Sequence, residues 1–255
     1  SLTELNSLPY KEFTIVKDTE QQTNFYFKNC SVSVDADGNV KTHKYSNTGN
    51  CIWDANKIPH DFAIQPIDFL DKELNVLPVD KLPCEFARFV RLASHNPKNE
   101  EEAGFAPKII TERFFSFCTS IGYLLDGWKH PAKRQGIFAV DHRIAERGEH
   151  NGRSGKSIIP KACQTMKCVA TINGKTYDPR YQFANEVITV DTQIINFNDM
   201  RQNFDVEDIF EIIADDYNVN RPKPTTDECH NQGRVTPGNQ EINPSHVEVA
   251  KISRS

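Results

Sequence analysis

The tripeptide Gly155-Lys156-Ser157 has the residue types that a phosphate-binding loop requires. Small residues let consecutive backbone N–H groups point at phosphate oxygens, a lysine neutralises the β- and γ-phosphates, and a hydroxyl at the start of the next helix binds Mg²⁺. At average residue usage such a tripeptide arises by chance in about one chain of this size in ten. Its meaning therefore depends on the residues around it.

The surroundings of this tripeptide favour the phosphate-loop interpretation. Strand-like residues, IFAV at 137–140, precede it, Gly148 and Gly152 open the loop GEHNGRSGKS, and an apolar stretch suited to a helix follows. Pro160 falls in the first turn of that helix, where a missing N–H is tolerated. His150 replaces the first glycine of the strict pattern G-x-x-x-x-G-K-[ST], so an exposed Gly/Ser loop between a strand and a helix is the alternative interpretation.

A phosphate site of this kind also needs an acidic group at the end of a neighbouring strand, to hold Mg²⁺ or to orient water. Asp199 follows the strand-like run IINFN at 194–198 and is the leading candidate. Asp191, which follows VITV at 187–190, is the rival. Either acid is also of a type that commonly serves in a turn or at a helix N-terminus.

The composition limits the possible partners. The 255 residues include 30 basic and 35 acidic ones, for a net charge of −5, so any DNA contact must be local. No run reaches the roughly 18 to 20 apolar residues of a membrane span, and no signal segment is visible, which predicts a soluble cytoplasmic protein without membrane contact. The seven cysteines lack metal-ligand spacing, so we expect reduced packing residues rather than a zinc site. A start at Ser1 favours a piece of a longer protein.

Periodicity predicts two parts in the first half of the chain. Near-alternation of apolar residues around the turn Asp37-Gly38 indicates a hairpin, which we assign to a small α+β module at residues 1–75. Apolar residues recur at helical spacing in 86–93 and 109–125, which predicts two packed helices in a helical segment at residues 76–130.

The second half of the chain has a different pattern. Strand, glycine loop, helix, two or three strands and a final helix follow one another, which predicts an α/β P-loop core at residues 131–225. Residues 226–255 are rich in Pro, Asn, Thr and Gly, and we expect an irregular tail in which only the stretch from His246 to Ile252 looks like a strand.

Three runs between about Ile121 and Arg221 carry a resemblance to a known family: IGYLLDGWKHPAKRQGIFAVDHRI, EHNGRSGKSIIPKACQTMK and TINGKTYDPRYQFANEVITVDTQIINFNDMRQNFDVEDIFEIIADDYNVNR. They resemble the ATPase region of superfamily 3 helicases in primase-helicase proteins of phages and bacterial mobile elements. The resemblance implies an AAA+-like core, assembly as a ring that is usually hexameric, and ATP-driven translocation on single-stranded DNA during replication.

The resemblance also implies roles for individual residues. Lys156 would bind the phosphates and act in catalysis with Asp199, and Ser157 and Asp199 would hold Mg²⁺. The nucleotide-binding loop would comprise Asn151, Gly152, Arg153, Ser154, Gly155, Lys156 and Ser157. The chain departs from the family at Asn198, where a second acid is usual, and a neutral amide does not offset charge. After Arg221 we recognise neither the polar sensor strand nor the arginine-finger region.

The leading hypothesis is an ATP-dependent DNA helicase or ATPase of replication, in the cytoplasm of a bacterial host or phage-infected cell. Its cofactors would be ATP and Mg²⁺, and its partners single-stranded DNA and further copies of the chain. We expect the isolated chain to be monomeric or weakly associated and to hydrolyse ATP slowly. We expect Arg201 to pair with Asp199 or Asp205 at the surface. Two alternatives stay open: a noncatalytic nucleotide-binding replication module, which Asn198 permits, and a P-loop small-molecule kinase.

Overall fold

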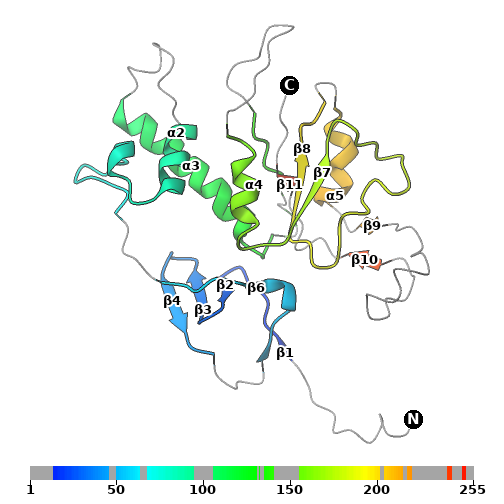
Figure 1. The fold of residues 1–255 in the computed structure, drawn as a ribbon, viewed down its shortest axis with the longest axis horizontal. Helices are drawn as coiled ribbons and strands as arrows, with labels where there is room; N and C mark the ends of the chain where they lie inside the picture. The colour runs from blue at the N-terminus through cyan, green and yellow to red at the C-terminus, as the bar shows by residue number, and fades with distance from the viewer. Residues whose placement is uncertain are drawn as a thin grey trace, which may run out of the picture. The chain divides into compact units, whose positions relative to one another are not determined.

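The computed structural model describes residues 14–45, 50–63, 68–94, 106–130, 132, 135–140, 155–201, 204–214, 217–219, 240–242 and 249–250. The chain divides into two compact units, Ser1–Phe62 and Ala63–Ser255 (Figure 1). This division falls earlier than the boundary at about residue 75 that the sequence predicts. The predicted helical segment and the predicted α/β core lie together in the second unit.

Unit 1 is built from short strands and one 3-10 turn. Its four-stranded sheet has the order β4-β3-β2-β6, in which β2, β3 and β4 are antiparallel neighbours and β6 runs parallel to β2. A separate parallel pair joins β1 to β5. The elements are β1 (Thr14–Ile15), β2 (Gln22–Phe27), β3 (Ser31–Asp35), β4 (Val40–His43), β5 (Asn50–Cys51), η1 (Asp54–Asn56) and β6 (Lys57–Ile58).

The predicted hairpin is confirmed in unit 1 as the pair β3 and β4, where Val34 lies opposite Val40. Gly38 in the turn has φ +82°, a conformation that favours glycine. Val32 and Ile58 are each 3% exposed and form the apolar side of the sheet. No α-helix occurs among the described residues of this unit, so its described part is a β module.

Both predicted helices of unit 2 are confirmed, as α2 (Glu85–Ser94) and α3 (Pro107–Leu125), after the short 3-10 turn η2 (Val79–Lys81). Proline at the first position of α3 suits a helix start, where its missing N–H costs nothing. The two helices pack on one another around a cluster of buried side chains. The cluster comprises Val76, Val90 and Phe114, with Phe69, Leu70, Phe89, Ile110, Phe117, Cys118 and Ile121 packed against it.

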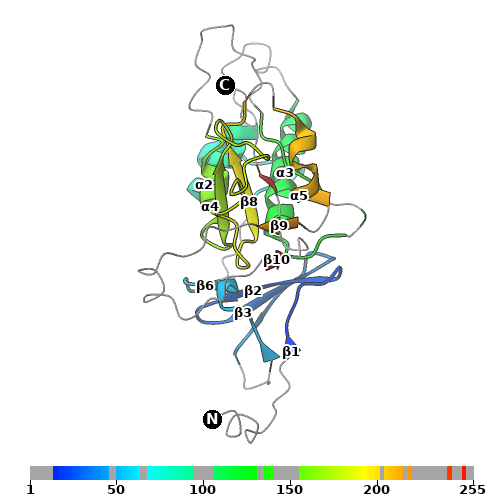
Figure 2. The same ribbon diagram turned by 90° about the vertical axis from the view of Figure 1, so that its right-hand side faces the viewer.

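The centre of unit 2 is a parallel sheet with the order β11-β8-β7, formed by β7 (Val169–Asn173), β8 (Ile194–Asn198) and β11 (Val249–Ala250). Helix α4 (Ile158–Cys163) lies on one face of β8, and α5 (Phe210–Ala214), which follows η3 (Val206–Ile209), lies on the other (Figures 1 and 2). Burial on both faces explains why four of the five β8 residues are buried.

The two faces of this sheet belong to different clusters. Ile195 and Phe197 point to the α5 side, where they join Ile172 and Ile209. Ile194 points to the α4 side, with Cys163 of α4 and Leu124 of α3. Alternate residues along β7 divide in the same way, because successive strand side chains point to opposite faces.

Three predictions about strands need correction. The described residues 135–140 form no extended strand, although IFAV has the composition of one. The run VITV at 187–190 lies in a turn, closed by the bond from the Thr192 N–H to the Thr189 carbonyl. Ile188 is fully buried there, so its side chain holds the turn against the core. In the predicted irregular tail, β11 falls within the strand-like stretch 246–252 and joins the central sheet, whereas β10 (Gln240–Ile242), which the sequence does not predict, forms an antiparallel pair with β9 (Tyr217–Val219).

None of the helices in the described ranges combines the length and the apolar character needed to cross a bilayer.

Candidate functional site

The described part of the predicted phosphate loop is its last three residues, because Asn151, Gly152, Arg153 and Ser154 lie outside the described residues. Gly155 has φ +79°, a left-handed conformation that residues with a Cβ rarely adopt. The Ile158 N–H donates to the Gly155 carbonyl at 2.9 Å, and the Ile159 N–H donates to the Lys156 carbonyl at 3.3 Å. The loop therefore ends in a tight turn that leads directly into α4.

Gly155 is also held by a close neighbour from α2. A Cβ placed on Gly155 would lie 2.6 Å from Cε2 of Phe89, closer than side-chain carbons approach one another. Phe89 itself packs against the buried cluster between α2 and α3. The backbone conformation favours glycine at 155, and a Cβ there would also force the ring of Phe89 to move.

The start of α4 is directed toward the carboxyl ends of β7 and β8. Cys163, the last residue of α4, lies in one cluster with Val169 and Ile194, which begin the two strands. Helix α4 therefore runs against the direction of the strands, and Lys156 and Ser157 lie away from the strands' amino ends. In open α/β sheets the carboxyl ends of the strands form the usual ligand-binding edge.

The carboxyl ends of β7 and β8 are joined very closely. The Gly174 N–H, just after β7, donates to the Asn198 carbonyl at 2.6 Å. A Cβ on Gly174 would lie 2.8 Å from the Met200 Cα, so only glycine fits there. Asp199 has φ +55°, an unusual conformation that Asp tolerates better than most residues. The chain thus turns sharply at the acid that the sequence predicts for catalysis.

Polar side chains line the α4 face toward this end of the sheet. Asn196 is only 4% exposed, and its Nδ2 lies 3.3 Å from the Thr171 Oγ1 on the neighbouring strand. Its Oδ1 is buried and has no hydrogen-bond partner among the described residues. An orphaned buried acceptor costs about 1–3 kcal/mol, so the Asn196 Oδ1 is suited to accept a hydrogen bond from a water or a ligand. Asn196 is not among the site residues that the sequence predicts, although the alternation Ile194, Asn196, Asn198 signals a face that becomes polar.

Asp191, the rival acid, lies at the opposite end of the sheet. It precedes β8 and lies near Cys168, which comes just before β7. Burial, and to a lesser degree the negative charge of Asp191, raises the pKa of the Cys168 thiol. The geometry therefore leaves Asp199 as the acid that follows β8 directly at its carboxyl end. Asn198 donates from Nδ2 to the Asp199 Oδ2 at 3.4 Å, so the amide and the carboxylate are neighbours.

Arg201 connects the turns that follow β7 and β8. Its Nε donates to the Lys175 carbonyl, which links the turn after β8 to the turn after β7. In the described part of the chain it makes no ion pair with Asp199 or Asp205, contrary to expectation. Asp205 instead caps η3, where it accepts from the Glu207 N–H at 3.0 Å. Arg201 thus has a structural role, and Arg221 lies outside the described residues.

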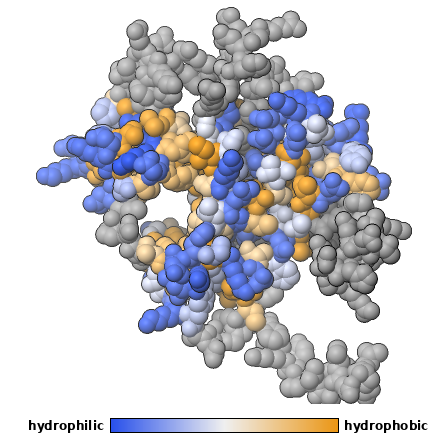
Figure 3. Space-filling view, in the orientation of Figure 1, coloured by the Kyte–Doolittle hydropathy of each residue, from blue (hydrophilic) through white to orange (hydrophobic). Residues whose placement is uncertain are grey.

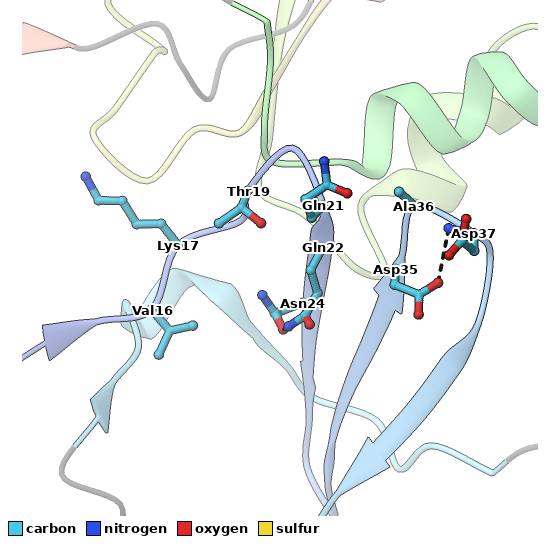
Figure 4. Close-up of a pocket in the computed structure, with 9 residues that line it drawn as sticks. All are labelled: Val16, Lys17, Thr19, Gln21, Gln22, Asn24, Asp35, Ala36 and Asp37. Atoms are coloured by element: carbon cyan, nitrogen blue, oxygen red, sulfur yellow. Dashed lines mark hydrogen bonds between the residues drawn. The ribbon is translucent and has the colours of Figure 1, made fainter.

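A shallow cleft of about 530 Å³ occurs in unit 1 (Figure 4). The Asp35 carboxylate is engaged in a local turn, where it accepts from the Asn39 N–H at 2.9 Å and the Asp37 N–H at 3.1 Å. The side-chain bond from Asn39 is the main cause that holds the pKa of Asp35 below its ordinary value. The lining residues are Val16, Lys17, Thr19, Gln21, Gln22, Asn24, Asp35, Ala36 and Asp37.

Mg²⁺ prefers oxygen ligands. Ser157 and Asp199 would supply a hydroxyl and a carboxylate, and phosphate oxygens and waters would complete the coordination shell. Within the described ranges no three His, Cys, Asp or Glu side chains gather as a metal-binding group. A cation would therefore depend on a bound phosphate for much of its coordination.

Comparison with known proteins yields no match: no family model, no curated protein and no solved structure is significantly similar to this chain.

Proposed function

We propose that unit 2 binds ATP with Mg²⁺ and belongs to a replication ATPase of the superfamily 3 helicase type, which couples hydrolysis to movement on single-stranded DNA. The main support is the left-handed turn at Gly155, which brings Lys156 and Ser157 to the start of α4 on the side of the strands' carboxyl ends. Asp199, at the end of the central strand, is the acid on that side.

In this proposal each residue has a distinct task. Lys156 offsets the charge of the β- and γ-phosphates, and the backbone N–H groups of the loop from Asn151 to Ser157 bind their oxygens. Ser157 and Asp199 hold Mg²⁺, which would neutralise charge that develops on the transferred phosphoryl group. Asp199 also orients the attacking water. Phosphoryl transfer needs mainly such positioning and charge neutralisation from a protein.

Asn198 favours a second candidate, a nucleotide-binding module without turnover. The neutral amide supplies no charge where a second acid would, and its Nδ2 occupies one acceptor of Asp199. A weaker negative field binds Mg²⁺ less tightly, so we propose slow hydrolysis in the isolated chain. ATP binding without measurable release of phosphate, with and without single-stranded DNA, would favour the module over the helicase.

We further propose that the intact protein assembles as a ring in the cytoplasm, while the isolated chain is monomeric or weakly associated. A ring ATPase binds nucleotide between subunits, and an arginine of the neighbour completes the site. The described part of the chain contains no arginine that we can assign to that task. Sedimentation that shows a stable hexamer with brisk, DNA-stimulated hydrolysis would contradict the expected weak association.

The binding proposal is tested with Lys156→Ala. The affinity for ATP and Mg²⁺, measured by calorimetry, is expected to fall at least about tenfold because the charge that serves the phosphates is lost. Lys161→Ala is the matched control, since Lys161 is an exposed lysine at the other end of α4. Circular dichroism and thermal unfolding show whether each variant is folded. Equal affinity in the wild type and in Lys156→Ala would exclude the phosphate loop.

A further inference from the structure

Two aromatic side chains of α2 lie beside the predicted phosphate loop. The ring of Phe89 meets Gly155 directly, as the 2.6 Å from its Cε2 to a Cβ at that position shows. Phe86 lies one turn earlier on the same helix, and the two ring centroids are 6.0 Å apart with 32° between the planes. The pair therefore forms an aromatic surface that extends from Gly155 along α2.

The exposure of Phe86 has no explanation in the packing of the helices. It is 38% exposed, whereas Ala87 and Val90 form the buried face of α2. Phe86 is also absent from the apolar cluster that holds α2 against α3. Burial of a phenylalanine is worth about 1.5–3 kcal/mol, so the folded protein forgoes part of this stabilisation. In Figure 3 the surface over α2 and α3 is among the more hydrophobic parts of that face.

We propose that Phe86 and Phe89 form the platform on which the base of the bound nucleotide stacks. This inference rests on the proposed function, because the phosphates are taken to bind at Gly155, Lys156 and Ser157. The contact between Gly155 and Phe89 brings the platform next to the phosphates, and Phe86 continues it outward toward solvent. The ligand class is then a nucleoside triphosphate, and the site recognises its base as well as its phosphates.

Stacking also determines the expected specificity. Every base has a π-face, so an aromatic platform tolerates different bases, and larger purine rings cover more of it than pyrimidine rings. ATP and GTP are therefore expected to bind with similar affinity, and CTP and UTP more weakly. Inorganic tripolyphosphate, which has no base, is expected to bind most weakly of all.

The test compares ATP with inorganic tripolyphosphate on the 255-residue chain in the presence of Mg²⁺. Phe86→Ala is expected to weaken ATP about tenfold, in line with the energy of base stacking, and to leave the tripolyphosphate affinity unchanged. Phe115→Ala is the matched control, because Phe115 is a similarly exposed phenylalanine of α3, at 42%. Phe86→Leu, which keeps an apolar side chain without a π-face, separates stacking from simple burial and is expected to resemble Phe86→Ala.

Phe86→Trp supplies a direct signal. Its added indole fluorescence, measured against the wild-type background of Trp53 and Trp128, is expected to be quenched by ATP and unchanged by tripolyphosphate. Unchanged ATP affinity in Phe86→Ala, or equal loss for both ligands, would overturn the platform. If Lys156→Ala binds both ligands as tightly as the wild type does, the result contradicts the proposed function itself, and not only the aromatic platform. The two failures are therefore distinguishable.

Discussion

The two faces of the parallel sheet in unit 2 differ in what they contain. The α5 face is apolar along β8, where Ile195 and Phe197 are completely buried. The α4 face is apolar only at the amino end of the strand, at Ile194, and becomes polar at Asn196 and Asn198. The α5 face therefore serves stability, whereas the polar half of the α4 face retains one buried acceptor, the Asn196 Oδ1, that has no hydrogen-bond partner among the described residues.

Unit 1 shows that polar residues alone do not make a site. In its cleft, the Asp35 carboxylate accepts hydrogen bonds within its own turn, from the N–H groups of Asn39 and Asp37. Asn196, by contrast, is deeply buried with an unused acceptor. A buried polar group without a partner is the stronger indication of a ligand, because no hydrogen bond offsets the free-energy cost of its burial.

The largest effect on stability is expected on the α5 face. Phe197→Ala should lower the free energy of unfolding by about 3–5 kcal/mol, because it leaves a cavity in the cluster that holds α5 to the sheet. Denaturant unfolding measures the change. Phe210→Ala is the control on α5, where Phe210 is 60% exposed, and should stay within about 0.5 kcal/mol of the wild type. Equal losses in the two variants would contradict the assigned faces.

Asp199→Asn is expected to affect hydrolysis far more than folding. Asparagine also tolerates the left-handed backbone at 199, so the turn should persist. The rate of ATP hydrolysis should fall on the order of 100-fold because charge at the metal is lost. ATP affinity should change much less, since the backbone donors of the loop remain. Asp191→Asn is the matched control at the other end of β8, and a larger loss there would refute the choice of Asp199.

Asn196→Val is expected to separate stability from function. Removal of the orphaned amide should raise the free energy of unfolding by up to about 1 kcal/mol, because valine suits a strand and leaves no unsatisfied acceptor. Binding of ATP should weaken in the same variant. Ile195→Val, on the opposite face, should instead cost about 1 kcal/mol and leave ATP binding intact. A less stable Asn196→Val variant with normal ATP affinity would mean that the amide serves only packing.

The smallest expected effect is the change of the free energy of unfolding with pH that comes from Cys163, on the apolar half of the α4 face. Burial raises the pKa of the Cys163 thiol from 9.0 to about 11, so the folded state holds this proton more tightly than the unfolded chain. The resulting stabilisation is complete below pH 9.0 and is lost as the pH rises through about 11. Unfolding measured across this window should show a steeper decline for the wild type than for Cys163→Ala. Parallel declines would indicate that water reaches this half of the face.

Local sequence determined the elements whose signals lie within a few residues. Helical spacing identified α2 and α3, and the turn at Gly38 identified the hairpin of β3 and β4. The apolar runs CVATI and IINF indicated β7 and β8, although a similar run, VITV, forms a turn. In these cases periodicity and turn-forming residues act over the same short range as the structure they produce.

Tertiary structure alone decided which of these residues meet. It separated Asp199 from Asp191 by placing them at opposite ends of β8, and it brought Phe89 against Gly155. It also paired the strand-like tail residues Val249 and Ala250 with β8, and it left the Asn196 Oδ1 without a partner among the described residues. Each of these outcomes depends on packing between segments far apart in the chain, where the burial of whole faces outweighs the preferences of any short run of residues.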